Sequence, residues 1–173
     1  MKKFFFLSAS IVLALIPATS LAMDEIQMLP TRVKLDSSKS NNKSHVNVES
    51  KDIAYSVKVT STFFKDVENV TVKYNIFYQV MDLGSKGEPD TKLSAGSHTF
   101  PILLGNKAVE FETDPIKLAK AALDPGWYYT NGASARAQDK VVGVWMKAFD
   151  STGKQIGEYT NPSSVGQKQK WKD

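Results

Sequence analysis

The chain has 173 residues, a formal net charge of +4 and no cysteine, with 42% hydrophobic and 23% charged residues. This composition is ordinary for a globular domain, and the lack of cysteine excludes disulfides, Cys-ligated zinc and thiol nucleophiles. It also excludes attachment to a membrane through a lipidated cysteine. We therefore expect a single domain that is stabilised by packing and strand pairing alone.

Residues 1–22 have the layout of a secretory signal peptide. Two lysines precede an apolar run from Phe4 to Ile16, and Ser20-Leu21-Ala22 places small residues at a cleavage site. The apolar run is shorter than the roughly 20 residues that span a bilayer, so a cleaved leader is favoured over a permanent anchor. We expect export to the periplasm or outside the cell, with no stable membrane span after cleavage. The Met-Lys-Lys start resembles that of bacterial leaders.

Removal of the leader and its two lysines lowers the net charge from +4 to +2. This surplus is too small for the basic surface of a nucleic-acid-binding protein. Residues 23–43 are expected to form a flexible N-terminal segment, because 36–44 contains no apolar residue that could be buried. A short edge strand at 32–35 is the alternative.

Apolar and polar residues alternate along 53–63 and again along 70–80, which predicts two strands with one buried face each. The residues between them, 64–69, carry a lysine, two acids and an asparagine, which is typical of a hairpin loop. The side chains that we expect in the core include Val57, Val72, Tyr74 and Ile76.

Residues 82–97 form a polar stretch that we expect to be a loop. A strand follows at 100–104, where Pro101 favours the edge of a sheet because proline cannot donate a hydrogen bond. Another strand is expected at 109–113. Asp114-Pro115 is then typical of a helix start, so we expect a short helix near 116–123.

Residues 130–140 are polar and are expected to be a loop. Val141 to Phe149 carries apolar residues on both faces, which favours a central strand. A turn at Asp150 to Gly153 and a return strand at 156–160 follow. Residues 162–173 are expected to be a polar, basic tail.

About seven strands separated by turn residues predict an all-β, antiparallel β-sandwich. The strand order, the Gly143-Val-Trp145 strand and the Asp150 to Gly153 hairpin are similar to those of bacterial immunoglobulin-like or fibronectin-III-like modules. The resemblance implies one immunoglobulin-like sandwich over residues 44–161. The disulfide of antibody domains has no counterpart here, since the chain lacks cysteine.

Residues with catalytic or metal-binding chemistry are few. The two histidines, His45 and His98, lie too far apart in sequence for the close spacing of common His metal sites. No serine lies in a G-x-S-x-G elbow, and Glu110 and Glu112 share a strand face that we expect to be solvated. We therefore expect a protein that is not an enzyme and has no catalytic residue, cofactor or metal.

The aromatic residues are the candidates for partner binding. Trp127, Tyr128 and Tyr129 are consecutive beside glycine, so at least one ring should point outward. Trp145 is expected on an outer strand face with Phe149. Exposed rings of this kind stack on sugars or anchor protein interfaces. The alternative is that they cover the ends of the sandwich or pack against the 116–123 helix.

The sequence therefore favours an exported binding or adhesion module for a protein or glycan partner, in the bacterial envelope or outside the cell. Its candidate partner-binding residues are Trp127, Tyr128 and Trp145. A periplasmic structural, assembly or inhibitor protein that captures a partner at a strand edge is the alternative. A hydrolase is the least favoured class.

Overall fold

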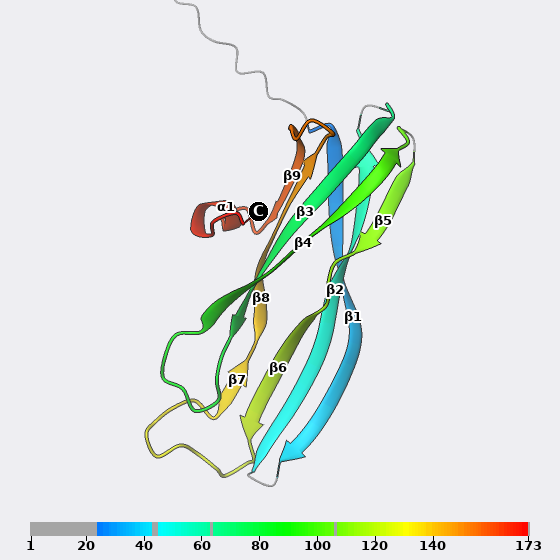
Figure 1. Cartoon of the computed structure of the whole chain (residues 1–173). Helices are drawn as coiled ribbons and strands as arrows, with labels where there is room; N and C mark the ends of the chain where they lie inside the picture. Colours follow the sequence, from blue (N-terminus) through cyan, green and yellow to red (C-terminus); the bar gives the residue numbers. More distant parts are fainter. Residues whose placement is uncertain (1–23, 43–44, 63, 106, 173) are drawn as a thin grey trace, which may run out of the picture.

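The computed structural model describes residues 24–42, 45–62, 64–105 and 107–172. The leader expected at 1–22 lies outside these residues. Nine strands form two antiparallel sheets that pack face to face in an elongated sandwich (Figure 1). The prediction of an all-β sandwich is confirmed. Within the described ranges, no helix is long and apolar enough to cross a bilayer.

The first sheet has the order β1-β2-β6-β7, and β5 also pairs with β2. β2 is long enough to pair with β5 along 56–60 and with β6 along 46–53, on the same edge. The strand bounds in this sheet are Ile26–Asn42 for β1, Val46–Ser61 for β2, Ala108–Glu112 for β5, Ile116–Leu123 for β6 and Arg136–Gln138 for β7.

The second sheet has the order β4-β3-β8-β9. β8 is therefore central, as predicted, and Pro101 lies in edge strand β4, also as predicted. The strand bounds are Val67–Val80 for β3, Asp90–Leu103 for β4, Lys140–Phe149 for β8 and Gln155–Asn161 for β9. One short helix, α1 (Val165–Lys168), follows β9.

The core lies between the sheets and is built from the alternating faces that the sequence predicts. Val57, Val72 and Ile76 have no exposed surface, and Tyr74 is 4% exposed. The inward faces of β1, β4, β5, β6 and β9 add further apolar side chains, among them Ile26, Met28, Leu103, Phe111, Leu118 and Ile156.

The expectation that 23–43 is flexible is wrong for the part that the structure describes. β1 pairs with β2 from Ile26 to Asn42, apart from one irregularity between Lys34 and Asp36. Its start is anchored by Ile26 and Met28, which are buried. The side chains of residues 36–40 are exposed. This polar part of β1 is stabilised by its backbone hydrogen bonds to β2, which an argument from side-chain burial alone overlooks.

The expectation of a helix near 116–123 is also wrong. Ile116 and Leu118 point into the core while Lys117 and Lys120 are exposed, and the segment pairs with β2 as strand β6. Long-range pairing thus outweighs the helix-start pattern at Asp114-Pro115.

Four further expectations change. β2 and β3 belong to different sheets, so 64–69 is not a hairpin loop: 64–66 lies in the connection between the sheets and 67–69 begins β3. Half of 82–97 is not a loop, since β4 begins at Asp90 and pairs with β3. The segment 130–140 contains β7, and the described residues form nine strands instead of about seven.

The chain crosses from the first sheet to the second at Asp139, between β7 and β8. Its buried carboxylate accepts hydrogen bonds from the backbone N–H groups of Met81, after β3, and Ala119, in β6, at 3.1 and 2.8 Å. One side chain thus joins the two sheets at the crossing point.

Candidate functional site

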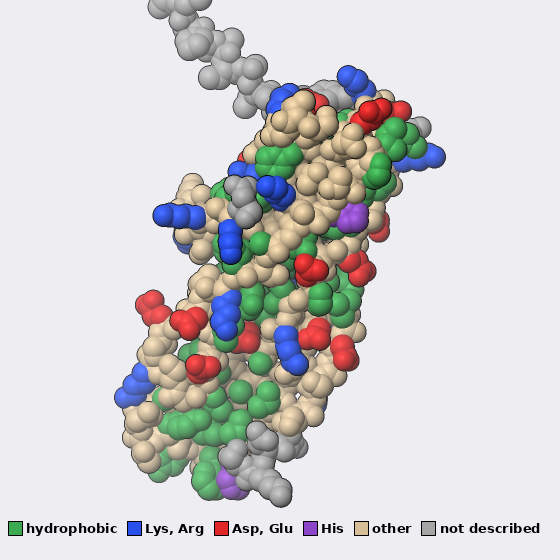
Figure 2. All heavy atoms as spheres, in the orientation of Figure 1, with side chains coloured by type: hydrophobic (Ala, Val, Ile, Leu, Met, Phe, Trp, Pro, Cys, Tyr) green, Lys and Arg blue, Asp and Glu red, His purple; other side chains and the backbone are tan. Residues whose placement is uncertain are grey.

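The loop from β6 to β7, residues 124–135, carries two of the three sequence-predicted candidates. Trp127 is 54% exposed and Tyr128 is 76% exposed. The loop lies at the end of the molecule where β1 ends and β2 begins (Figure 1). Figure 2 shows hydrophobic side chains and a histidine side chain gathered at this end. The prediction that at least one ring points outward is confirmed.

The local sequence explains how Trp127 is presented. Asp124-Pro125-Gly126-Trp127 forms a tight turn in which the N–H of Trp127 donates to the carbonyl oxygen of Asp124 at 3.1 Å. Gly126 has φ of +88°, which suits the third position of a type II turn, and proline is favoured at the second. The turn brings Trp127 back toward the start of β2.

The indole of Trp127 stacks on the imidazole of His45, at the start of β2. The ring centroids are 4.0 Å apart and the planes differ by 15°. His45 has φ of +58°, in the left-handed region. Its carbonyl oxygen accepts from the N–H of Asp124 at 2.9 Å.

Asp124 organises this cluster through its side chain. One carboxylate oxygen lies 3.3 Å from Nδ1 of His45, and the other accepts from the amide of Asn47. The backbone of Asp124 bonds both His45 and Trp127. We name Trp127, Tyr128, His45 and Asp124 the aromatic end. Because the exposed indole of Trp127 is held by the stack on His45 and by the backbone hydrogen bond to Asp124, its position needs little ordering when a partner binds.

Tyr129, the third ring of the run, has a structural role. It lies against Gly84 in the loop between β3 and β4, where an added Cβ would be 2.8 Å from Cζ of Tyr129. This packing joins the two loops and leaves only Trp127 and Tyr128 directed outward.

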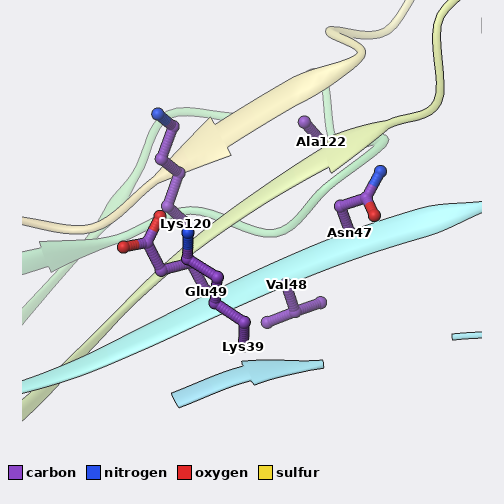
Figure 3. A pocket seen from close by; sticks show the side chains of 6 residues that line it. All are labelled: Lys39, Asn47, Val48, Glu49, Lys120 and Ala122. Carbon is purple, nitrogen blue, oxygen red and sulfur yellow. The ribbon is translucent and has the colours of Figure 1, made fainter. Parts of the chain in front are cut away.

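A hollow of about 240 Å³ adjoins the aromatic end on the first sheet. Figure 3 shows Lys39, Glu49 and Lys120 gathered at one side of it and Asn47 and Ala122 at the other. Asn47 belongs to both features, since its amide also bonds Asp124.

Trp145 does not join the aromatic end. It lies on β8 and is 9% exposed, and its indole N–H donates to Glu158 at 2.6 Å. Trp171 meets it edge to face at 5.3 Å, and the ammonium group of Lys147 lies about 5 Å from both rings.

The C-terminal tail is the element that covers Trp145. Val165 of α1 packs on Trp145 and Phe77, and the carbonyl of Lys172 accepts a hydrogen bond from the side chain of Asn75. The tail expected at 162–173 is therefore polar but packed against the second sheet.

Two other residues considered in the sequence have ordinary surroundings. His98 stacks on Phe111, with centroids 4.9 Å apart, so it supports the core edge. Glu110 is exposed on β5. Among the described residues, no group of three or more His, Asp or Glu side chains is arranged to hold a metal ion.

Sequence reasoning missed the role of His45, Asp124 and Asn47. His45 and Asp124 are 79 residues apart in sequence, and they meet only because β2 and β6 pair. The one local signal in the sequence is the Asp124-Pro125-Gly126 turn that positions Trp127.

No family model matches the chain, and the search of curated proteins found no match. Among solved structures, the chain is similar to a protein described as "X-ray structure of Northeast Structural Genomics Consortium target SoR45". The identity is 9%, the match covers 79% of this chain and 85% of that one, and the TM-score is 0.34.

Proposed function

We propose that this chain is an exported, non-enzymatic binding or adhesion module of the bacterial envelope or cell exterior, and that the aromatic end is its contact surface. The observation that carries the proposal is the His45–Trp127 stack, which holds an exposed indole in a fixed position. Trp and Tyr are enriched among the residues that dominate binding energy at interfaces. The sandwich itself favours no activity, because this architecture supports many functions.

Export is supported by the signal-peptide layout of residues 1–22. The similarity of the strand pattern to bacterial immunoglobulin-like modules also favours a binding role. Neither catalytic residues nor a cofactor enter the proposal, since the aromatic end contains no nucleophile paired with a base.

A capture experiment tests the proposal. The exported protein is immobilised and washed with envelope fragments from the cell that produces it, and the retained material is quantified. Trp127→Ala should reduce retention at least about tenfold, as loss of an interface anchor does. Phe64→Ala is the matched control, because Phe64 is 82% exposed and lies in the β2–β3 connection, away from the β6–β7 loop. Equal retention by both variants would contradict the proposal.

A structural or assembly role through strand capture is the second candidate. It is favoured by β4, a 14-residue strand at the edge of its sheet, since edge strands can pair with a strand of a partner. Retention that survives Trp127→Ala but is lost when proline replaces Ser94 in β4 would support this role instead.

A further inference from the structure

The hollow and the aromatic end form one continuous surface. Asn47 pairs with Ala122 and Glu49 with Lys120 in the β2–β6 register. Side chains two residues apart on a strand share a face, so Asn47 and Glu49 of β2 lie on the same face as their partners Ala122 and Lys120 of β6. The amide of Asn47 donates to the carboxylate of Asp124, which also lies 3.3 Å from Nδ1 of His45, so Asn47 joins the hollow to the aromatic end.

The indole of Trp127 has one open face on this surface. The imidazole of His45 covers the other face at a centroid distance of 4.0 Å. Because 54% of Trp127 is nevertheless exposed, the exposed area belongs to the opposite face and the ring edge. A flat, apolar platform of one ring is therefore available to a ligand, with the exposed phenol of Tyr128 following it in the chain.

The hollow contributes both hydrogen-bond donors and hydrogen-bond acceptors. Lys39 and Lys120 supply ammonium donors, Glu49 supplies a carboxylate acceptor, and Asn47 supplies an amide. Lys39 and Lys120 are the cross-strand neighbours of Glu49. At about 240 Å³, the hollow is smaller than the roughly 300–1,000 Å³ of pockets for drug-sized ligands. This volume suits one ring-sized group.

We propose that the aromatic end and the hollow together bind a saccharide, with one sugar ring on the open face of Trp127 and hydroxyl groups directed to Glu49, Asn47 and Lys120. The inference rests on the proposed function and names the class of its ligand. A sugar ring presents C–H groups on its faces, which pack on an aromatic ring, and hydroxyl groups at its rim, which need both donors and acceptors. The surface offers this combination within one face.

A protein partner fits the surface less well. A specific protein interface buries about 800 Å² on each partner, and its centre is apolar and depleted of charged residues. Here the exposed large apolar side chains are Trp127 and Tyr128, and the adjoining hollow is lined by Lys39, Glu49 and Lys120. Those three charges would be buried at the centre of such an interface.

The test uses the immobilised exported protein and envelope fragments treated in three ways. Periodate opens sugar rings that carry vicinal diols, lysozyme cleaves 1,4-linked chains of N-acetylated sugars, which lack vicinal diols within the chain, and proteinase K removes proteins. We expect periodate or lysozyme treatment to abolish retention, with or without loss after proteinase K. Retention that survives both periodate and lysozyme would overturn the saccharide inference. If retention survives these treatments but is lost in Trp127→Ala, the proposed binding function stands. If Trp127→Ala keeps retention as well, both proposals fail.

Soluble probes then test the two parts of the surface. Cellotetraose, maltotetraose and N-acetylchitotetraose are titrated while tryptophan fluorescence is recorded, and at least one should give a saturable change. Glu49→Ala and Tyr128→Ala should each weaken its binding at least about fivefold. Glu110→Ala and Phe64→Ala, which alter exposed side chains of the same types elsewhere, should leave it unchanged. Equal affinities in Glu49→Ala and Glu110→Ala would exclude the hollow from the site.

Discussion

Tyr74 and Asp114 make two hydrogen bonds to each other. The phenol donates to Oδ2 of Asp114 at 3.0 Å, and the backbone N–H of Asp114 donates to the phenol oxygen at 3.0 Å. Tyr74 belongs to β3 of the second sheet, and Asp114 lies between β5 and β6 of the first. This pair therefore joins the two sheets at the point where the sequence predicts a helix start.

The first prediction concerns alkaline pH. Burial raises the pKa of the Tyr74 phenol, opposed by the backbone hydrogen bond from Asp114 and reinforced by the Asp114 carboxylate. Because the pKa is higher in the folded state, the stabilisation is complete below the unfolded pKa of about 10 and is lost as pH rises through the folded pKa. Tyr74→Phe should therefore lose stability less steeply above about pH 10.

Urea unfolding at several pH values measures this slope. At neutral pH, Tyr74→Phe should lower the free energy of unfolding by about 1–3 kcal/mol, because two partly buried hydrogen bonds are lost. Burial also raises the pKa of Tyr55, so part of the alkaline slope should remain. Tyr128→Phe, at an exposed position, is the control. If the free energy of unfolding of Tyr74→Phe falls with rising pH as steeply as that of the unaltered chain, the assignment of this pH dependence to Tyr74 is contradicted.

The second prediction concerns strand β1. Ile26 is 1% exposed, whereas Leu29 on the same strand is 48% exposed. Ile26→Ala should lower the free energy of unfolding by about 2–5 kcal/mol, and Leu29→Ala should change it by less than about 0.5 kcal/mol. Thermal and urea unfolding of both variants checks this. Similar small effects would indicate that β1 is detached from the core in solution.

The sequence predicts those strands whose residues alternate clearly. In β2 and β3 the apolar residues themselves mark the buried face, and Val57, Val72 and Ile76 are buried as expected. In β8 apolar residues on both faces indicate a central strand, which is where it lies. β1 escaped prediction because an edge strand can carry polar side chains on both faces when a neighbour supplies the backbone hydrogen bonds. The segment of β6 is predicted as a helix because Asp114-Pro115 has the pattern of a helix start, whereas the pairing with β2 that makes it a strand is not visible in the sequence.

The candidate site was predicted only in part. Trp127 and Tyr128 are exposed, as an aromatic run in a glycine-bounded loop suggests. The partner of Trp127, His45, depends on the β2–β6 register, which a single sequence does not reveal. Trp145 was expected on an outer strand face. It is buried because Trp171 and Val165 of the C-terminal tail cover it, and the expectation did not take this tail into account.

The third prediction concerns the sheet crossing at Asp139. Asp139→Ala would leave the N–H groups of Met81 and Ala119 without their acceptor, and each buried unsatisfied group costs about 1–3 kcal/mol. The free energy of unfolding should fall by at least about 2 kcal/mol. Asp139→Asn should give a smaller loss, since one amide oxygen remains. Asp90→Ala, at an exposed position, is the control, and an equal effect there would contradict the role of Asp139.

The fourth prediction concerns the tail. Trp171→Ala removes the ring that meets Trp145 at 5.3 Å and that faces Lys147. Trp145 should become more accessible, so acrylamide should quench its fluorescence more strongly in this variant than in Trp171→Phe, which keeps an aromatic ring at the position but no second indole. The comparison is made in a Trp127→Phe background, which removes the exposed indole. Unchanged quenching would show that Trp171 does not cover Trp145.

The fifth prediction separates a binding role of Trp127 from a structural one. Trp127 is 54% exposed and Trp145 is 9% exposed. Trp127→Ala loses mainly the stack on His45, so the free energy of unfolding should fall by no more than about 1.5 kcal/mol. Trp145→Ala should lower it by about 3–5 kcal/mol, as truncation of a buried aromatic ring does. Urea unfolding of both variants at one pH gives the comparison. If both variants lose the same free energy of unfolding, Trp127 stabilises the end of the sandwich. If folded Trp127→Ala then also retains envelope material, this stabilisation is the whole role of Trp127.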